Sequence, residues 1–175
     1  MTTPDLDAFL ASRGVGMVLE EYRDMRAAAV GKTLDVSGCT DPVMRHFYSV
    51  RGGELPSRPA KTPLLDPVAR RVHKDEATGE YVTTGYTTPG DGGKNGVPLI
   101  RNAEFAWETW GVPRPYIFLC AIEDEGGFLY DPRTGEVLDF DLGEAESLAA
   151  GERRVVAPSF EEFVVWYIGS ARWKR

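Results

Sequence analysis

The sequence has little cysteine and little histidine, and this scarcity limits the sites that it can build. Among its 175 residues there are two cysteines, Cys39 and Cys120, and two histidines, His46 and His73. Two cysteines do not make a disulfide framework, and without a close Cys/His cluster a zinc site is not expected. Cys120 lies in an apolar segment, where a buried thiol is the expected state. We therefore expect neither a metal nor a cofactor.

Long apolar runs are also missing. No run approaches the roughly 20 residues that are needed to cross a bilayer. The start of the chain, Met1 to Asp5, lacks the basic and apolar regions of a signal peptide. These absences predict a cytoplasmic protein that does not enter a membrane. The length of 175 residues predicts a single domain, 1–175.

Basic residues are fewer than acidic residues, and they are unevenly distributed along the sequence. The net charge of −7 disfavours nucleic-acid binding, because phosphate contacts need a basic surface. From Pro42 to Lys74 seven Lys/Arg stand against two acids, whereas from Ala121 to Glu152 ten acids stand against Arg133 alone. Such asymmetry favours steered association with a charged partner. Alternatively, both stretches are solvated loops.

Capping signals and apolar spacing predict helices in the first third of the chain. Thr3 is a cap with Pro4 at the first helical position, and a second helix is expected from Met17 to Val30, ended by Gly31. These two helices make residues 1–36 an N-terminal helical extension. A third helix is predicted to start at Thr40-Asp41-Pro42.

Residues 60–98 form the least organised part, an irregular insertion. Alternation at Arg70–His73 and Tyr81–Thr84 suggests two strands within it. The glycine-rich loop Pro89–Gly96 lacks the Ser or Thr and the following helix of a phosphate-binding loop. Further on, Asn102 is expected to cap a short helix that runs to Glu108.

The C-terminal third predicts strands followed by a helix. The apolar run Tyr116–Ile122 suits a strand that is covered on both faces. Phe128–Tyr130 and Glu136–Phe140 suit two more antiparallel strands, joined by a turn that Gly135 closes. Ser159 caps a helix with an apolar face at i, i+3, i+4, i+7 and i+8. We expect this face to pack on the sheet and give an α+β domain.

The order of these motifs resembles the SMI1/KNR4 (SUKH) superfamily. The resemblance rests on an acidic link at Glu123–Gly127, the hairpin Tyr-Asp-Pro-x-Thr-Gly-x-Val at Tyr130–Val137 and Ala-Pro-Ser-Phe-Glu-Glu-Phe at Ala157–Phe163. Phe47-Tyr48 followed by Gly52–Pro56 adds a looser match. The resemblance implies an α+β fold, with Tyr116–Ile122 as a central strand of a curved antiparallel or mixed sheet flanked by helices.

The same resemblance implies a non-catalytic binding function. Bacterial members are typically immunity proteins that neutralise the cognate toxin of a polymorphic toxin system, often a nuclease or deaminase. Eukaryotic relatives are regulatory adaptors, for which the partner here is expected to contact the basic stretch around Arg70-Arg71 or the long insertion. The family has no common catalytic residue set, so none is assigned to this chain.

An acidic patch is the candidate partner-binding site, because it suits the basic cleft of a nuclease toxin as a phosphate mimic. Leu142 and Leu148 would add apolar anchors, and the alternative is a solvated loop before the last helix. The predicted residues are Glu123, Asp124, Glu125, Asp139, Asp141, Glu144 and Glu146.

An enzyme is not expected. Glu123–Glu125 have the oxygen ligands that Mg²⁺ prefers, but no second ligand set is visible. A Cys120/His pair would require a thiol that the sequence places in the core.

Overall fold

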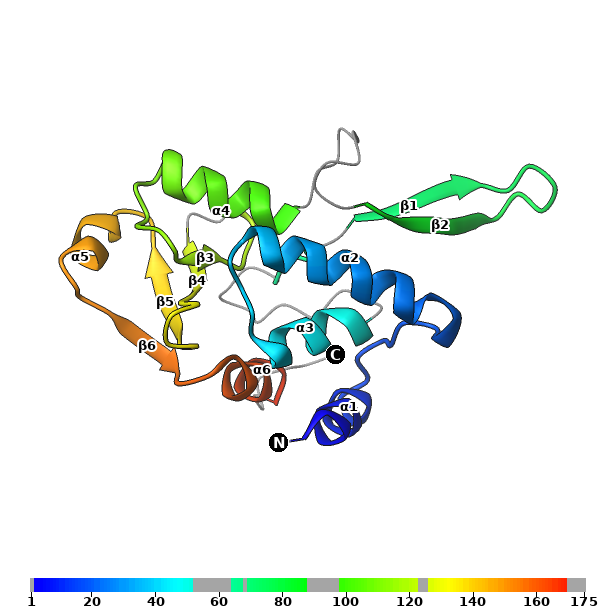
Figure 1. The fold of residues 1–175 in the computed structure, drawn as a ribbon, viewed down its shortest axis with the longest axis horizontal. Coiled ribbons are helices and arrows are strands. Elements are labelled where there is room, and N and C mark those ends of the chain that lie inside the picture. Colours follow the sequence, from blue (N-terminus) through cyan, green and yellow to red (C-terminus); the bar gives the residue numbers. More distant parts are fainter. Residues whose placement is uncertain (1, 52–63, 68, 88–97, 123–125, 170–175) are drawn as a thin grey trace.

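The structure contains a four-stranded antiparallel sheet with helices packed against both of its faces (Figure 1). The computed structural model describes residues 2–51, 64–67, 69–87, 98–122 and 126–169. Neighbouring strands follow one another in the order β3-β4-β5-β6. The strands of this sheet are β3 (Ile117–Phe118), β4 (Gly126–Tyr130), β5 (Val137–Asp141) and β6 (Arg154–Ala157).

Six α-helices accompany the sheet in the described residues, and together they confirm the predicted α+β class. Two of them, α1 and α2, are the two helices that were predicted within the first 36 residues. The helices are α1 (Thr3–Ser12), α2 (Arg23–Val36), α3 (Pro42–Val50), α4 (Pro98–Glu108), α5 (Ala145–Ala149) and α6 (Phe160–Gly169).

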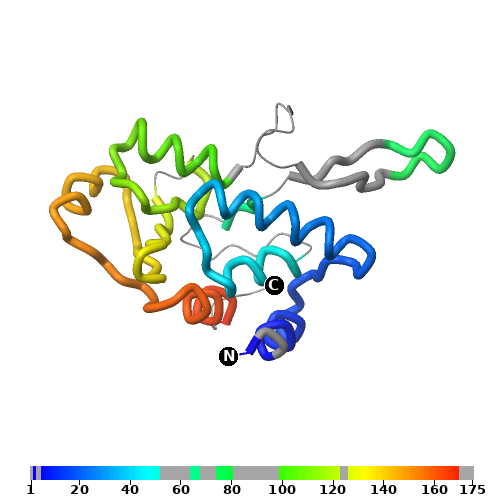
Figure 2. The backbone as a smooth tube through the Cα atoms, viewed as in Figure 1, coloured from blue at the N-terminus to red at the C-terminus, as the bar shows by residue number. Residues whose placement is uncertain are grey.

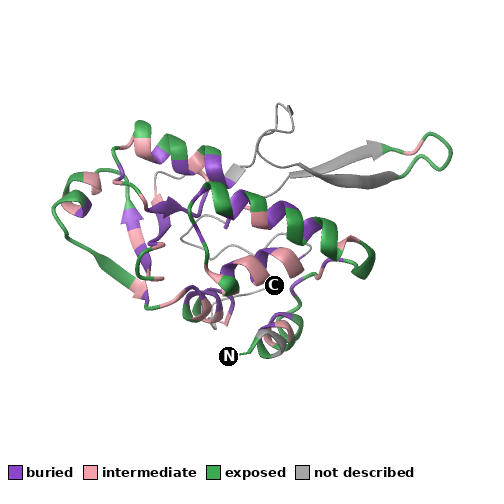
Figure 3. Ribbon diagram, in the orientation of Figure 1, coloured by how far each residue is buried: buried purple, intermediate pink, exposed green. Residues whose placement is uncertain are grey.

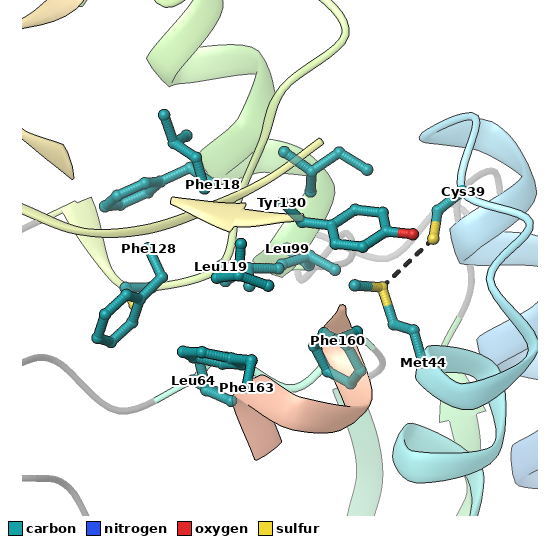
Figure 4. Packing of buried hydrophobic residues seen from close by; sticks show 14 of the residues in the cluster. Cys39, Met44, Leu64, Leu99, Phe118, Leu119, Phe128, Tyr130, Phe160 and Phe163 are labelled. Carbon is teal, nitrogen blue, oxygen red and sulfur yellow. Dashed lines mark hydrogen bonds between the residues drawn. The ribbon is translucent and has the colours of Figure 1, made fainter. Parts of the chain in front are cut away.

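Aromatic side chains cover both faces of the sheet. On one face, Trp110, which follows α4, packs edge-on against Phe118 with ring centroids 5.2 Å apart. On the other face, Phe163 of α6 packs against Phe128 of β4, with centroids 4.9 Å apart (Figure 4). The strand register explains this division, because directly opposed residues share a face and successive residues alternate.

Helix α6 confirms the prediction made for the end of the chain. The Ser159 hydroxyl accepts a hydrogen bond from the backbone N–H of Glu162 at 3.2 Å, as expected of a cap. Phe160 also contacts α3, where its ring lies 5.5 Å from that of Phe47. The predicted apolar face is buried at every position: Phe160, Phe163, Val164, Tyr167 and Ile168.

The first sheet strand is shorter than predicted and lies at an edge. Pairing limits β3 to Ile117–Phe118, although every residue from Tyr116 to Cys120 is buried. The continuous apolar run of the sequence therefore indicates which residues are buried, but it does not indicate the length of the strand. The placement as a central strand is wrong for the described sheet. Beyond β3, Leu64 and Cys120 form an isolated bridge, and the Leu119 backbone hydrogen-bonds to Leu65 and Phe128.

The β4–β5 hairpin confirms the prediction, but two elements after it were not foreseen. Gly135 closes the turn with φ +80°, a conformation that favours glycine. After β5 the chain forms α5 and then returns as β6, which pairs antiparallel with β5. Figure 2 shows this return path as an outward loop between β5 and α6. The expectation of a plain loop before α6 is therefore wrong.

Both N-terminal helices have different bounds from those predicted. The cap of α1 is Thr2 rather than Thr3, because the Asp5 carboxylate accepts from the N–H and hydroxyl of Thr2. Helix α2 begins only at Arg23, since Met17 forms a β-bridge with Arg51 and the N–H of Val18 donates to Val50 O at 2.7 Å. Gly31 lies inside α2, where packing offsets its cost of about 1 kcal/mol.

Helix α3 begins where the sequence predicted, whereas α4 begins earlier than predicted. The Asp41 carboxylate accepts from the backbone N–H groups of Val43 and Met44 at the beginning of α3. Helix α4 begins at Pro98, so Asn102 is not its cap. The Asn102 amide instead donates to Cys120 O at 2.8 Å and ties α4 to the chain beyond β3.

Part of the predicted irregular insertion is regular structure. Strands β1 (Ala69–Lys74) and β2 (Tyr81–Thr87) form a separate two-stranded antiparallel sheet, which confirms the predicted pair. Figure 1 shows this hairpin extending away from the four-stranded sheet. The glycine-rich loop Pro89–Gly96 lies outside the described residues.

Candidate functional site

The predicted acidic residues that the structure describes lie on three consecutive pieces of chain. Asp139 and Asp141 belong to β5, Glu144 precedes α5, and Glu146 lies in its first turn. Glu123–Glu125 lie outside the described residues. The described residues of the predicted patch therefore lie on β5 and on the segment that leads from β5 into α5.

Arg154 of β6 brings three of these acids together. Its Nη2 lies 2.6 Å from Glu144 Oε2, 3.2 Å from Asp141 Oδ2 and 3.7 Å from Asp139 Oδ2. We call Arg154 and these three acids the exposed cluster, because about half of the Arg154 side chain is exposed. The hydrogen bond to Asp141 and the neighbouring carboxylates hold the pKa of Arg154 above its ordinary value.

Strand register and a glycine account for this grouping. Asp139 lies directly opposite Arg154 on neighbouring strands, a position where opposite charges stabilise a pair. Gly126 lies opposite Asp141 on β4. A Cβ at Gly126 would come within 2.7 Å of Asp141 Oδ1, so the absence of a side chain makes room for that carboxylate.

A second arginine neutralises acids at the neighbouring turn. Arg153 Nη2 lies 3.2 Å from Asp131 Oδ2 and 2.5 Å from Glu136 Oε2. Arg133 also binds Asp131, with its Nε 2.9 Å from Asp131 Oδ1. Burial acts to raise the pKa of Asp131, but the hydrogen bonds and charges of Arg133, with the charge of Arg153, hold it below its ordinary value.

The acidic stretch is therefore less negative than its sequence count indicated. That count ended at Glu152, immediately before Arg153 and Arg154. From Asp131 to Arg154 the chain carries seven acids and three arginines, so an excess of four negative charges remains. Glu146 and Glu152 are exposed, and neither forms an ion pair with any described residue. The surface stays acidic, but most of its carboxylates are already paired.

A cavity of about 190 Å³ lies between β5, α5 and the start of β6. Figure 3 shows exposed residues in both α5 and β6, whereas the neighbouring strand β5 is mostly buried. Of the two leucines predicted as apolar anchors, Leu148 is buried at 8% exposure and Leu142 is exposed. The residues lining the cavity are Asp139, Phe140, Glu144, Ser147, Leu148, Glu152, Arg153 and Arg154.

Arg153, Arg154, Ser147 and Glu152 belong to the cavity but were missed from the sequence. The apolar pair Val155-Val156 after the two arginines was the available signal, because β-branched residues favour strands. A strand there would have placed the arginines beside the acids of β5.

The described residues of the basic stretch lie in different surroundings. Arg45 is paired with Asp35, and Arg51 is buried. Arg70 and Arg71 lie on β1, within the projecting hairpin. Arg58 and Lys61 lie outside the described residues. The positive charges are thus divided between ion pairs of the body and the hairpin.

The groups considered for other chemistry lie elsewhere. Cys39 and Cys120 are both buried, which confirms the prediction for Cys120, and burial raises the pKa of Cys39 to about 11. His46 contacts Asp7 through its Nε2 at 2.7 Å, linking α3 to α1. Among the described residues no group of three or more His, Cys, Asp or Glu is placed to hold a metal ion. None of the described helices is long and apolar enough to cross a membrane.

Comparisons with known proteins give no relative for this chain. No protein-family model matches it, and no curated protein or solved structure shows a significant match.

Proposed function

We propose that this chain is a non-catalytic protein-binding module of the immunity type, which binds and neutralises a toxin with a basic cleft. The exposed cluster carries the proposal, because three carboxylates converge on one arginine at the end of a packed sheet. The cluster itself contains three negative charges and the one positive charge of Arg154. The family resemblance of residues 116–168 and of the looser segment 47–56 is the second support.

The surface suits electrostatic recognition of a basic partner. Charged groups at the rim of an interface mainly raise the association rate and suppress wrong partners. Glu146 and Leu142 are exposed beside the cluster and offer a further charge and an apolar contact. The sheet beneath is fixed by aromatic packing, so these groups need little reorganisation on binding.

Charge reversal of the two β5 acids tests this proposal. Cells that produce a toxin encoded by a neighbouring reading frame should grow when this chain is co-produced. The double variant D139K/D141K should lose that rescue, since it replaces two negative charges with two positive ones. The affinity for the same toxin, measured at low salt, should fall more than tenfold, which corresponds to about 1.4 kcal/mol.

The matched control is E20K/E21K, which reverses two exposed acids of the 3₁₀ turn Glu20–Tyr22. This control should rescue growth like the unmodified chain, and circular dichroism should show that both variants fold. If D139K/D141K folds, rescues growth and binds with unchanged affinity at low salt, the exposed cluster is not the contact surface.

The regulatory adaptor remains the second candidate, and the β1–β2 hairpin favours it. This hairpin projects from the body and places Arg70 and Arg71 on a separate two-stranded sheet (Figure 1). Projecting arms of this kind offer a contact surface without disturbing the core. Loss of partner binding in R70E/R71E, with D139K/D141K unaffected, would select the adaptor over the immunity protein.

A further inference from the structure

The cavity between β5, α5 and β6 has the size of one side chain. Its volume of about 190 Å³ is smaller than the roughly 300–1,000 Å³ of pockets that enclose a small molecule. It lies at an exposed end of the molecule, where α5 and β6 are accessible (Figure 3). A group inserted from a protein partner therefore fits it better than a free cofactor does.

Its lining combines an apolar part with a charged rim. Phe140 and Leu148 supply the apolar part and are both buried. Asp139, Glu144 and Glu152 supply carboxylates. This combination matches a long basic side chain, which packs its methylene stem on apolar surface and keeps its charged end among acids.

Among the charged residues that line the cavity, the one without an ion pair to a described residue is an acid. Arg153 already pairs with Asp131 and Glu136, and Arg154 already pairs with the three acids of the exposed cluster. Glu152, in contrast, forms no ion pair within the described part of the chain. A cationic group can therefore gain a partner here, whereas an anionic group would compete with carboxylates already bound to both arginines.

We propose that this cavity receives an arginine side chain of the protein partner, with Glu152 as one of its carboxylate contacts. Arg154 shows that carboxylates at this end of the sheet hold a guanidinium group, whose planar fork matches carboxylate geometry. The inference rests on the proposed binding function, because it names the group through which a basic partner would be recognised.

A titration of the full chain with Nα-acetyl-argininamide tests the inference. Amide NMR signals of Ser147, Leu148, Glu152 and Arg153 should shift and saturate as this probe is added. Nα-acetyl-citrullinamide, which has nearly the same shape without the charge, should leave them in place. E152Q should weaken argininamide binding about twofold to fivefold, the range of an exposed ion pair.

The control variant is E104Q, which removes an exposed acid of α4 away from the cavity and should bind argininamide like the unmodified chain. Absence of saturable shifts, equal shifts with citrullinamide, or unchanged binding by E152Q would each overturn the inference. If these results appear while D139K/D141K still loses toxin rescue, the cavity inference fails and the proposed function stands. Saturable, charge-dependent binding without any toxin rescue supports the cavity and overturns the immunity function.

Discussion

Two ion-pair clusters in this protein have opposite imbalances of charge and opposite surroundings. In the exposed cluster one arginine, Arg154, meets three carboxylates. In the other, which we call the buried cluster, Arg26 and Arg51 both pair with the carboxylate of Asp66 among the described residues. Among the described residues, the buried cluster thus has more arginines than acids, and the exposed cluster has more acids than arginines.

The buried cluster joins three separate segments. Arg26 of α2 donates from Nε to Tyr48 O of α3 at 2.7 Å and from Nη2 to Asp66 Oδ2 at 2.8 Å. Arg51, just after α3, lies 3.8 Å from the same Asp66 oxygen and 5.2 Å from the Tyr48 ring centroid. Burial lowers the pKa of Arg51, while the charge of Asp66 acts to raise it.

The two clusters contain similar ion pairs, but the difference in their exposure indicates different roles. Both arginines of the buried cluster are at most 2% exposed, so the removal of Asp66 leaves their charges in a medium of low polarity. Arg154 is 52% exposed, so water and salt can take the place of its partners. We infer that the buried cluster stabilises the fold and that the exposed cluster is available to a partner.

The largest expected effect comes from D66N, which removes the acid that pairs with both arginines of the buried cluster. This change keeps the size of the side chain but takes away its negative charge. The free energy of unfolding should fall by about 3 kcal/mol, the lower end of the range for buried pairs, because a third of the Asp66 side chain is exposed. Thermal unfolding should show a decrease in Tm of about 6–12 °C.

D35N is the matched control, because it removes an exposed acid that pairs with Arg45. Its unfolding free energy should change by less than about 1 kcal/mol. Equal losses in D66N and D35N would show that burial does not separate the two kinds of ion pair.

A smaller effect is expected from the titration of Asp131, which is buried yet bound to arginines at the surface. Its folded-state pKa is held below the ordinary value. The resulting stabilisation is therefore complete above the unfolded-state pKa of about 4, and it is lost as the pH falls through the folded-state pKa. In urea unfolding, D131N should be less stable than the unmodified chain at pH 7 and should lose less stability on acidification.

The comparison variant for this measurement is E104Q, which removes an acid of α4 that forms no described ion pair. Its stability should follow the unmodified chain from about pH 7 to about pH 3. If D131N and the unmodified chain lose the same free energy over that range, Asp131 does not carry the proposed stabilisation.

Parts of the fold were predictable from the sequence where nearby residues determine the local structure. The apolar spacing of α6, the Asp41 cap and the Gly135 turn each depend on nearby residues, and each was predicted. Gly31 did not end α2, since packing of Val30 and Leu34 outweighs a local preference. Local signals therefore fixed the type of an element better than its ends.

The candidate site was predictable only in part, because charges were counted along the chain and not across strands. Asp139, Asp141 and Glu144 were expected and do lie together. Their contact with Arg154 depends on β6, which pairs with β5 after a detour through α5. The buried pair Arg26–Asp66 was missed for the same reason, since 40 residues separate its members.

The smallest expected effect on stability is that of R154Q, which removes the arginine of the exposed cluster. Loss of Arg154 leaves three acids to repel one another, but solvent screens this repulsion. The unfolding free energy should fall by less than about 1 kcal/mol, a decrease in Tm of less than about 4 °C. Differential scanning calorimetry at about 0.05 M and about 0.5 M salt should show the loss shrinking at the higher concentration.

R154K provides the control, since it keeps the charge and removes the planar fork that reaches several carboxylates. Its stability should lie between those of R154Q and the unmodified chain. A salt-independent loss of about 3 kcal/mol in R154Q would equal that expected of D66N. Arg154 would then hold the β5–β6 end of the sheet together as Asp66 holds α2 and α3, and the exposed cluster would be structural despite its exposure.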